Sequence, residues 1–136
     1  MKKVLFLLGA LFSFNAFAAN LEEGKQYVQV SQTASAQPEV IEFFSFYCPH
    51  CYAFEMEYHI PKQVAEGLPQ GTEFKNINSF AVNGLVNKQV NAAEQFQVRG
   101  VPDFYVNGKY RVNPEGLNYD DFVKDYVETV KGLLQK

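Results

Sequence analysis

The chain contains one stretch, Val40-Ile41-Glu42-Phe43-Phe44-Ser45-Phe46-Tyr47-Cys48-Pro49-His50-Cys51, in which a short apolar and aromatic run leads into its only two cysteines. A run of this length between Pro38 and Pro49 is typical of a β-strand that is buried on both faces. A helical stretch begins at Cys51 and must bend or end at Pro61, because a proline ring clashes with the preceding helical turn. We therefore expect a reactive site at a strand-to-helix junction, where open α/β sheets usually place their sites.

The two cysteines, Cys48 and Cys51, are better explained by reactivity than by stability. A disulfide that closes so short a loop stabilises a fold by roughly 2 kcal/mol before any strain is subtracted. We expect Cys48 at or just before a helix N-terminus and Cys51 one turn into the helix, where free N–H groups and the helix dipole favour a thiolate. Redox-active cysteines in such settings have pKa values of about 3.5–7.5, against about 8.5 when unperturbed. Such a site is easily reduced, and therefore oxidises other thiols.

Three neighbouring residues are candidates for tuning this pair. His50 could add positive charge or a hydrogen bond to a sulfur, or be an ordinary exposed histidine. Pro49 fixes φ and shapes the turn. Glu42 has apolar strand neighbours, and two interpretations are equally open. Its carboxyl is either desolvated, with a raised pKa, and exchanges a proton with Cys51, or it reaches solvent from an edge strand.

Zinc is the main chemical alternative for a C-x-x-C pair. A structural zinc site takes four ligands, usually including a second paired motif. Besides the cysteines, this chain offers only His50 and His59. We therefore expect no metal site and no cofactor other than the redox-active disulfide between the two cysteines.

The N-terminus predicts export. A basic start is followed by an apolar run over 4–14 and by Ala16-Phe17-Ala18, which is the layout of a secretory signal peptide and is too short to span a bilayer. A buried N-terminal helix or an uncleaved anchor are the alternatives. Cleavage after Ala18 would divide the chain into a signal peptide, 1–18, and one domain, 19–136. Oxidising conditions outside the cytosol allow a cysteine pair to cycle as a disulfide.

The rest of the chain predicts a mixed α/β order of strand–strand–helix–strand–helix–strand–strand–helix. Asn107-Gly108 is a strong hairpin signal, because both residues accept positive φ. The other expected elements are an edge strand over 27–30, a short strand over 72–77, a helix over 79–98, hairpin strands over 103–106 and 109–112, and a last helix capped by Asn118.

The motifs over 42–52, 99–102 and 106–110 together resemble the thioredoxin superfamily, and within it the DsbA-type periplasmic thiol:disulfide oxidoreductases. The resemblance covers nearly all of the mature chain. It implies an α/β, thioredoxin-like fold with a central mixed β-sheet flanked by helices. DsbA-type proteins carry a helical domain after the middle strand, but here 74–77 runs almost directly into 78–80. Most of that insertion is therefore missing, and the preceding strand is expected to be shortened.

The resemblance also implies roles for single residues. Cys48 would be the exposed nucleophile and Cys51 its buried partner. Val101 and a cis Pro102 would face the disulfide and pair with the substrate backbone. Glu42 and Glu55 would be acidic residues near the active site. Phe44 and Phe46 would be aromatic residues of the core.

We predict an exported enzyme, a protein thiol:disulfide oxidoreductase that introduces disulfide bonds into reduced, folding secreted proteins by exchange through Cys48–Cys51. The expected reoxidant is a DsbB-like membrane protein, and the expected state is a monomer. A net charge of −3 without a basic stripe argues against a nucleic-acid partner. A disulfide isomerase or reductase, and a truncated non-catalytic binding or chaperone-like remnant, are the alternatives. A natural minimal form, an engineered deletion and a defective gene product all fit the missing insertion.

Overall fold

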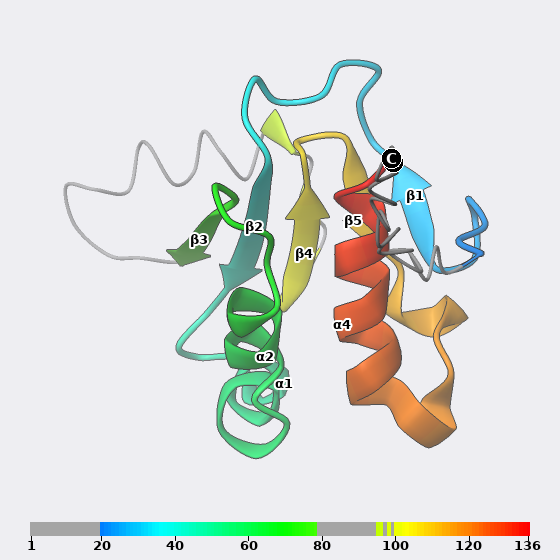
Figure 1. Cartoon of the computed structure of the whole chain (residues 1–136). Helices are drawn as coiled ribbons and strands as arrows, with labels where there is room; N and C mark the ends of the chain where they lie inside the picture. The colour runs from blue at the N-terminus through cyan, green and yellow to red at the C-terminus, as the bar shows by residue number, and fades with distance from the viewer. Residues whose placement is uncertain (1–19, 79–94, 97, 99) are drawn as a thin grey trace, which may run out of the picture.

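A five-stranded sheet organises the molecule (Figure 1). The computed structural model describes residues 20–78, 95–96, 98 and 100–136. The strands lie in the order β1-β5-β4-β2-β3, where β2 is parallel to β3 and the other pairs are antiparallel. The expected mixed sheet is therefore confirmed. The strand bounds are β1 Tyr27–Gln29, β2 Glu39–Phe44, β3 Glu73–Asn78, β4 Asp103–Val106 and β5 Tyr110–Val112.

The helices of the described chain pack together on one face of the sheet, with α4 beside α2 (Figure 1). The first helical stretch ends before Pro61, as expected, because His59 takes a positive φ of 52° and a new helix begins at Ile60. The bounds are α1 Pro49–Tyr52, a π-helical turn η1 Ala53–Glu57, α2 Ile60–Glu66, two 3-10 turns η2 Pro114–Gly116 and η3 Tyr119–Asp121, and α4 Phe122–Leu133.

β2 is buried on both faces, as its composition predicts. Val40 packs into the larger core cluster, which the helices α2 and α4 share. Ile41 and Phe43 pack with Tyr105 into a smaller cluster on the opposite face. Successive side chains of a strand point to opposite faces, so a run of apolar residues fills both layers. This central position fixes where β2 ends, and with it the start of α1.

The hairpin and the edge strands also follow from local chemistry. Asn107 and Gly108 take φ values of 53° and 62°, so the predicted turn between β4 and β5 is confirmed. β1 is an edge strand, as expected. β3, the strand before the missing insertion, has six residues, and they pair with all six of β2.

The C-terminal helix differs from expectation in its cap. Asn118 accepts a hydrogen bond from the Asp120 N–H and so caps η3, whereas α4 begins later, at Phe122. In α4, Leu133 is fully buried. The expected signal peptide and most of the helix expected over 79–98 lie outside the described residues. Among the residues that are described, no helix combines the length and the apolar character needed to cross a bilayer.

Candidate active site

The end of β2 delivers Cys48 to the start of α1. After Phe44 the chain turns, and the Cys48 N–H donates to the Ser45 carbonyl at 3.2 Å. Cys48 is the N-cap residue of α1, with extended backbone angles (φ −97°, ψ 114°), and Pro49 follows in the first helical turn. Proline suits that position because its missing N–H would have no partner in the helix. The predicted place of the first cysteine is therefore confirmed.

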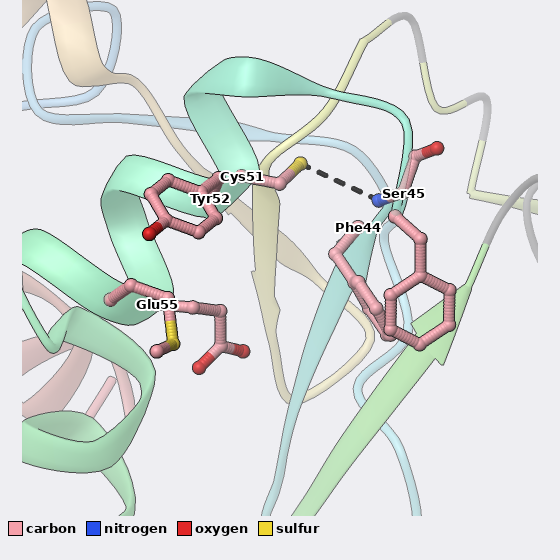
Figure 2. Close-up of a pocket in the computed structure, with 7 residues that line it drawn as sticks. Phe44, Ser45, Cys51, Tyr52 and Glu55 are labelled. Carbon is pink, nitrogen blue, oxygen red and sulfur yellow. Dashed lines mark hydrogen bonds between the residues drawn. The ribbon is translucent and has the colours of Figure 1, made fainter.

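Cys51 is the buried member of the pair, with only 2% of its surface exposed. Its Sγ accepts a hydrogen bond from the Ser45 N–H at 3.4 Å, which Figure 2 shows as a dashed line. Burial raises the pKa of the Cys51 thiol to about 12, and its Cys48 and Glu42 neighbours add to the rise against the opposing Ser45 hydrogen bond. The raised pKa favours the protonated thiol of Cys51 in the reduced protein, whereas Cys48 is the more exposed residue of the pair.

The loop before β4 completes the site from a distant part of the chain. The Cys48 Sγ–H donates to the Val101 carbonyl oxygen at 3.4 Å. The Val101–Pro102 peptide bond is cis, as the resemblance implied. β4 begins next, at Asp103, which lies opposite Phe43 of β2. The pairing of β2 with β4 thus brings the loop at 101–102 beside the cysteines.

Glu42 is a buried carboxyl in the middle of the sheet. Its residue exposure is 0%, and neither carboxyl oxygen has a hydrogen-bond partner among the described residues. Burial raises the pKa of Glu42 to about 8, and the nearby charge of Glu55 raises it further. The edge-strand alternative is wrong because β2 lies between β3 and β4. The desolvated carboxyl is the interpretation that holds.

Glu55 lies beside a cavity of about 370 Å³ that opens next to Cys51. In Figure 2, Tyr52 and Glu55 come from the helical segment, while Phe44 and Ser45 come from the chain at the end of β2. The cavity therefore joins the surroundings of the buried sulfur to a half-buried carboxylate. Its lining is mainly aromatic and apolar, and consists of Phe44, Ser45, Phe46, Cys51, Tyr52, Glu55 and Met56.

His50, Phe44 and Phe46 lie near the cysteines in sequence, but among the described residues His50 makes no hydrogen bond to them and neither phenylalanine is fully buried. His50 is exposed, and within the described part of the chain no hydrogen bond joins its ring to either sulfur. Phe46, expected in the core, is 79% exposed, and Phe44 is only partly buried. The reason is that β2 ends at Phe44, so the Phe46 ring lies beyond the sheet and packs edge-on against Phe44 at 5.1 Å.

Asp103 is the residue that sequence reasoning missed. Its carboxylate is buried (7% exposed), accepts a hydrogen bond from the Tyr105 hydroxyl at 3.1 Å, and lies 3.9 Å from Arg111 Nη1. Burial raises the pKa of Asp103 to about 6, although Arg111, Tyr105 and the Phe104 N–H each favour the charged form. An acidic residue directly after Pro102, at the head of an apolar strand, was the available signal.

The family model of the DSBA-like thioredoxin domain matches residues 62–127. A thiol:disulfide interchange protein DsbA from Haemophilus influenzae is 55% identical over 205 residues, and the alignment covers 100% of each chain. The protein of the same name from Escherichia coli K12 is 33% identical over 207 residues, again with 100% of each chain covered. Both alignments are longer than this 136-residue chain, so it lacks residues that these relatives have.

Solved structures show the same fold. A crystal structure of the disulfide oxidoreductase DsbA from Proteus mirabilis superposes with a TM-score of 0.74 at 24% identity, covering 86% of this chain and 98% of that chain. A variant of that protein with a non-covalently bound peptide, PWATCDS, superposes with a TM-score of 0.75, covering 87% and 100%. The thioredoxin-like arrangement expected for the sheet and helices is therefore confirmed.

Proposed function

Since this chain belongs to the DSBA-like thioredoxin family and is a thiol:disulfide oxidoreductase, we propose that it oxidises the thiols of folding, exported polypeptides through Cys48 and Cys51. The observation that carries the proposal is the asymmetry of the pair. Cys48 is accessible at a helix N-cap, whereas Cys51 is buried with its pKa raised to about 12. The difference in exposure suits Cys48 to exchange with clients. Because a sulfur with a high pKa is a slow leaving group, Cys51 needs a proton as the internal disulfide breaks.

The reaction oxidises two client thiols and reduces the pair. A client thiolate attacks Cys48 Sγ of the disulfide form, the Cys48–Cys51 bond breaks, and Cys51 leaves with the electron pair. Cys51 then takes up a proton, because its thiol is strongly favoured in this buried position. A second client thiolate attacks the client sulfur of the mixed disulfide. The client leaves with its new disulfide, and the protein is left as the dithiol.

Glu42 is the proposed proton donor to Cys51. A group with a pKa near the working pH is a suitable acid and base, and burial places the pKa of Glu42 at about 8. Glu55 borders the same cavity as Cys51 and is the proposed link between this buried proton and solvent. His50 stays a candidate for stabilising the charged form of Cys48, and Pro49 for shaping the turn.

Val101 and Pro102 are the proposed contact for the client backbone. The Val101 carbonyl already accepts a hydrogen bond from Cys48 Sγ, so it lies where a bound client cysteine would arrive. The peptide bound to the Proteus mirabilis protein supports a polypeptide rather than a small-molecule client.

The remaining parts of the proposal concern the setting. The protein would act in the periplasm after loss of residues 1–18, as a monomer, with the cysteine pair as its sole redox group. A DsbB-like membrane protein is the proposed reoxidant. The exposed aromatic side chains Phe46, Tyr47 and Tyr52 around the cysteines offer an apolar surface for unfolded clients.

The test is stoichiometric. The oxidised protein is mixed with a reduced peptide that carries two cysteines, and free thiols on the peptide are counted. One protein disulfide should remove two peptide thiols, Cys48→Ser should remove none, and Cys51→Ser should be unable to form the internal disulfide. No loss of thiols with the unmodified protein would overturn the proposal. A glutathione redox titration shows whether the protein oxidises or reduces its clients, because a reduction potential of about −270 mV would indicate a reductase.

A further inference from the structure

We propose that Asp103, acting through its contacts with Arg111 and Tyr105, is a positioning residue that holds the Val101 backbone in place for polypeptide clients. This inference rests on the proposed function, in which Val101 pairs with the client backbone. It assigns a purpose to a buried carboxylate that the exchange chemistry itself does not use.

The contacts form a small polar group on the sheet face opposite Glu42. Tyr105 Oη donates to Asp103 Oδ2 at 3.1 Å, from two residues further along β4. Arg111 Nη1 lies 3.9 Å from the same oxygen and comes from β5, where Arg111 pairs with Tyr105. Arg111 Nε is buried without a hydrogen-bond partner among the described residues, and Asp103 is the carboxylate paired with this guanidinium there.

The position of Asp103 connects this group to the cysteines. Asp103 is the first residue of β4 and pairs with Phe43 of β2. The chain reaches Val101 two residues earlier, and the Val101 carbonyl accepts the hydrogen bond from Cys48 Sγ at 3.4 Å. An anchor at the head of β4 therefore limits the movement of the backbone that faces Cys48. A displacement of this backbone by about 1 Å is enough to slow a positioned reaction by up to about 100-fold.

The charge of Asp103 is open to titration near neutral pH. Burial raises the pKa of Asp103 to about 6, against the opposing effects of Arg111 and Tyr105. On α4, the pKa of Tyr126 is raised by burial, and the negative charges of Asp103 and Glu42 raise it further. The Asp103–Arg111 pair is therefore intact above about pH 6 and weakens below it.

The experiment compares two substrates for each variant. One is a reduced peptide with two cysteines, and the other is dithiothreitol, which has no peptide backbone to pair. D103N and R111Q each remove the ion pair; D103N keeps the size of the side chain, and R111Q replaces the guanidinium with a shorter neutral amide. We expect the peptide rate constant to fall about tenfold more than the dithiothreitol rate constant in each variant. The double variant should lose no more than either single one, because both changes break the same pair.

Glu39→Gln is the matched control. It removes the Glu39–Lys75 ion pair, at 2.8 Å, from the opposite end of β2. The peptide-to-dithiothreitol ratio should not change in this variant, although its thermal stability can change. A ratio unchanged in both D103N and R111Q would overturn the inference, and if D103N fails to fold, R111Q decides. Failure of the unmodified protein with both substrates would instead overturn the proposed function.

A pH profile separates positioning from general stability. In the unmodified protein, the ratio should fall as the pH is lowered through about 6, because the Asp103 charge is lost. In D103N the ratio should be flat across the same range. The charge of Glu42 affects Cys51, which takes part in the reaction with either substrate. Its titration should therefore change both rate constants equally and leave the peptide-to-dithiothreitol ratio unchanged. Equal pH profiles for the two proteins would contradict the role of Asp103.

Discussion

Glu42 and Asp103 are two buried carboxyls on adjacent strands, with 0% and 7% of their surfaces exposed. They point to opposite faces of the sheet, because Asp103 pairs with Phe43, the strand neighbour of Glu42. Glu42 has no hydrogen-bond partner among the described residues, whereas Asp103 has Tyr105 and Arg111. Burial raises both pKa values, to about 8 and about 6. Arg111 and Tyr105 hold down the pKa of Asp103, whereas the charge of Glu55 raises that of Glu42, so the neighbours account for the difference between the two acids.

The presence or absence of partners suits the two acids to different roles, proton exchange for Glu42 and positioning for Asp103. An acid without partners, beside Cys51, has a proton to exchange at neutral pH. An acid held by two partners, beside the loop at 101–102, is suited to fixing geometry. The two faces of one strand pair would therefore serve the buried and the accessible ends of the same reaction.

The largest expected effect is on stability at Glu42. Its pKa in the fold is raised from 4.5 to about 8, so its stabilising contribution is complete below about pH 4.5 and is lost as the pH rises through about 8. At roughly 1.4 kcal/mol per unit, ionisation costs roughly 3–5 kcal/mol. Glu42→Gln should remove most of this loss between pH 5 and 9. Urea unfolding in a Cys48→Ser background measures it, and parallel pH curves for the two proteins would refute it.

Asp103→Asn should give a smaller effect in a lower pH window. The pKa of Asp103 is raised from 3.8 to about 6, so stability should be lost as the pH rises through about 6 rather than 8. At roughly 1.4 kcal/mol per unit, the expected change is about 3 kcal/mol, smaller than at Glu42 because Arg111 and Tyr105 hold down the pKa of Asp103. The same urea series tests it, with Glu39→Gln as control. A loss centred at the same pH as that of Glu42 would count against separate roles.

Giving Glu42 a partner should make it resemble Asp103. Asn76 of β3 lies directly opposite Glu42 in register, so the two side chains share a face of the sheet. Asn76→Lys would bring an ammonium beside the carboxyl and lower its pKa from about 8 by about 1 unit or more. Carboxyl-carbon NMR titration measures the shift, and Asn76→Gln is the neutral control. A pKa that stays at about 8 would show that the lysine does not reach the acid.

Removing a partner from Asp103 should have the reverse, smaller effect. Arg111→Gln takes away the charge that lowers the pKa of Asp103, which should therefore rise above about 6, by about 1 unit. The same NMR titration records it. An unchanged pKa would mean that Arg111 does not lower it, and a fall would contradict the favourable contact between the two charges.

Much of this architecture could be predicted from sequence because its causes are local. The apolar run of β2, the positive φ of Asn107 and Gly108, and the proline at the start of α1 each act within a few residues. The junction that holds Cys48 follows from these features. The cis bond before Pro102 could be expected only by resemblance, since local chemistry favours trans.

The errors lie where distant strands decide. The resemblance implied a core position for Phe46, but the sheet ends two residues before it, so its ring is exposed. For Glu42 the sequence left burial and an edge position equally open, and the flanking strands β3 and β4 decide for burial. Asp103 was missed because Arg111 reaches it from the neighbouring strand of the hairpin.

Trapping the mixed disulfide tests most directly whether Cys48 is the sulfur that exchanges with clients. The oxidised protein is mixed with a peptide that carries a single cysteine, quenched with acid and mapped by mass spectrometry. We predict the peptide on Cys48 alone, because Cys51 is only 2% exposed whereas Cys48 is half-buried. Peptide attached to Cys51, or shared equally between the two sulfurs, would contradict it.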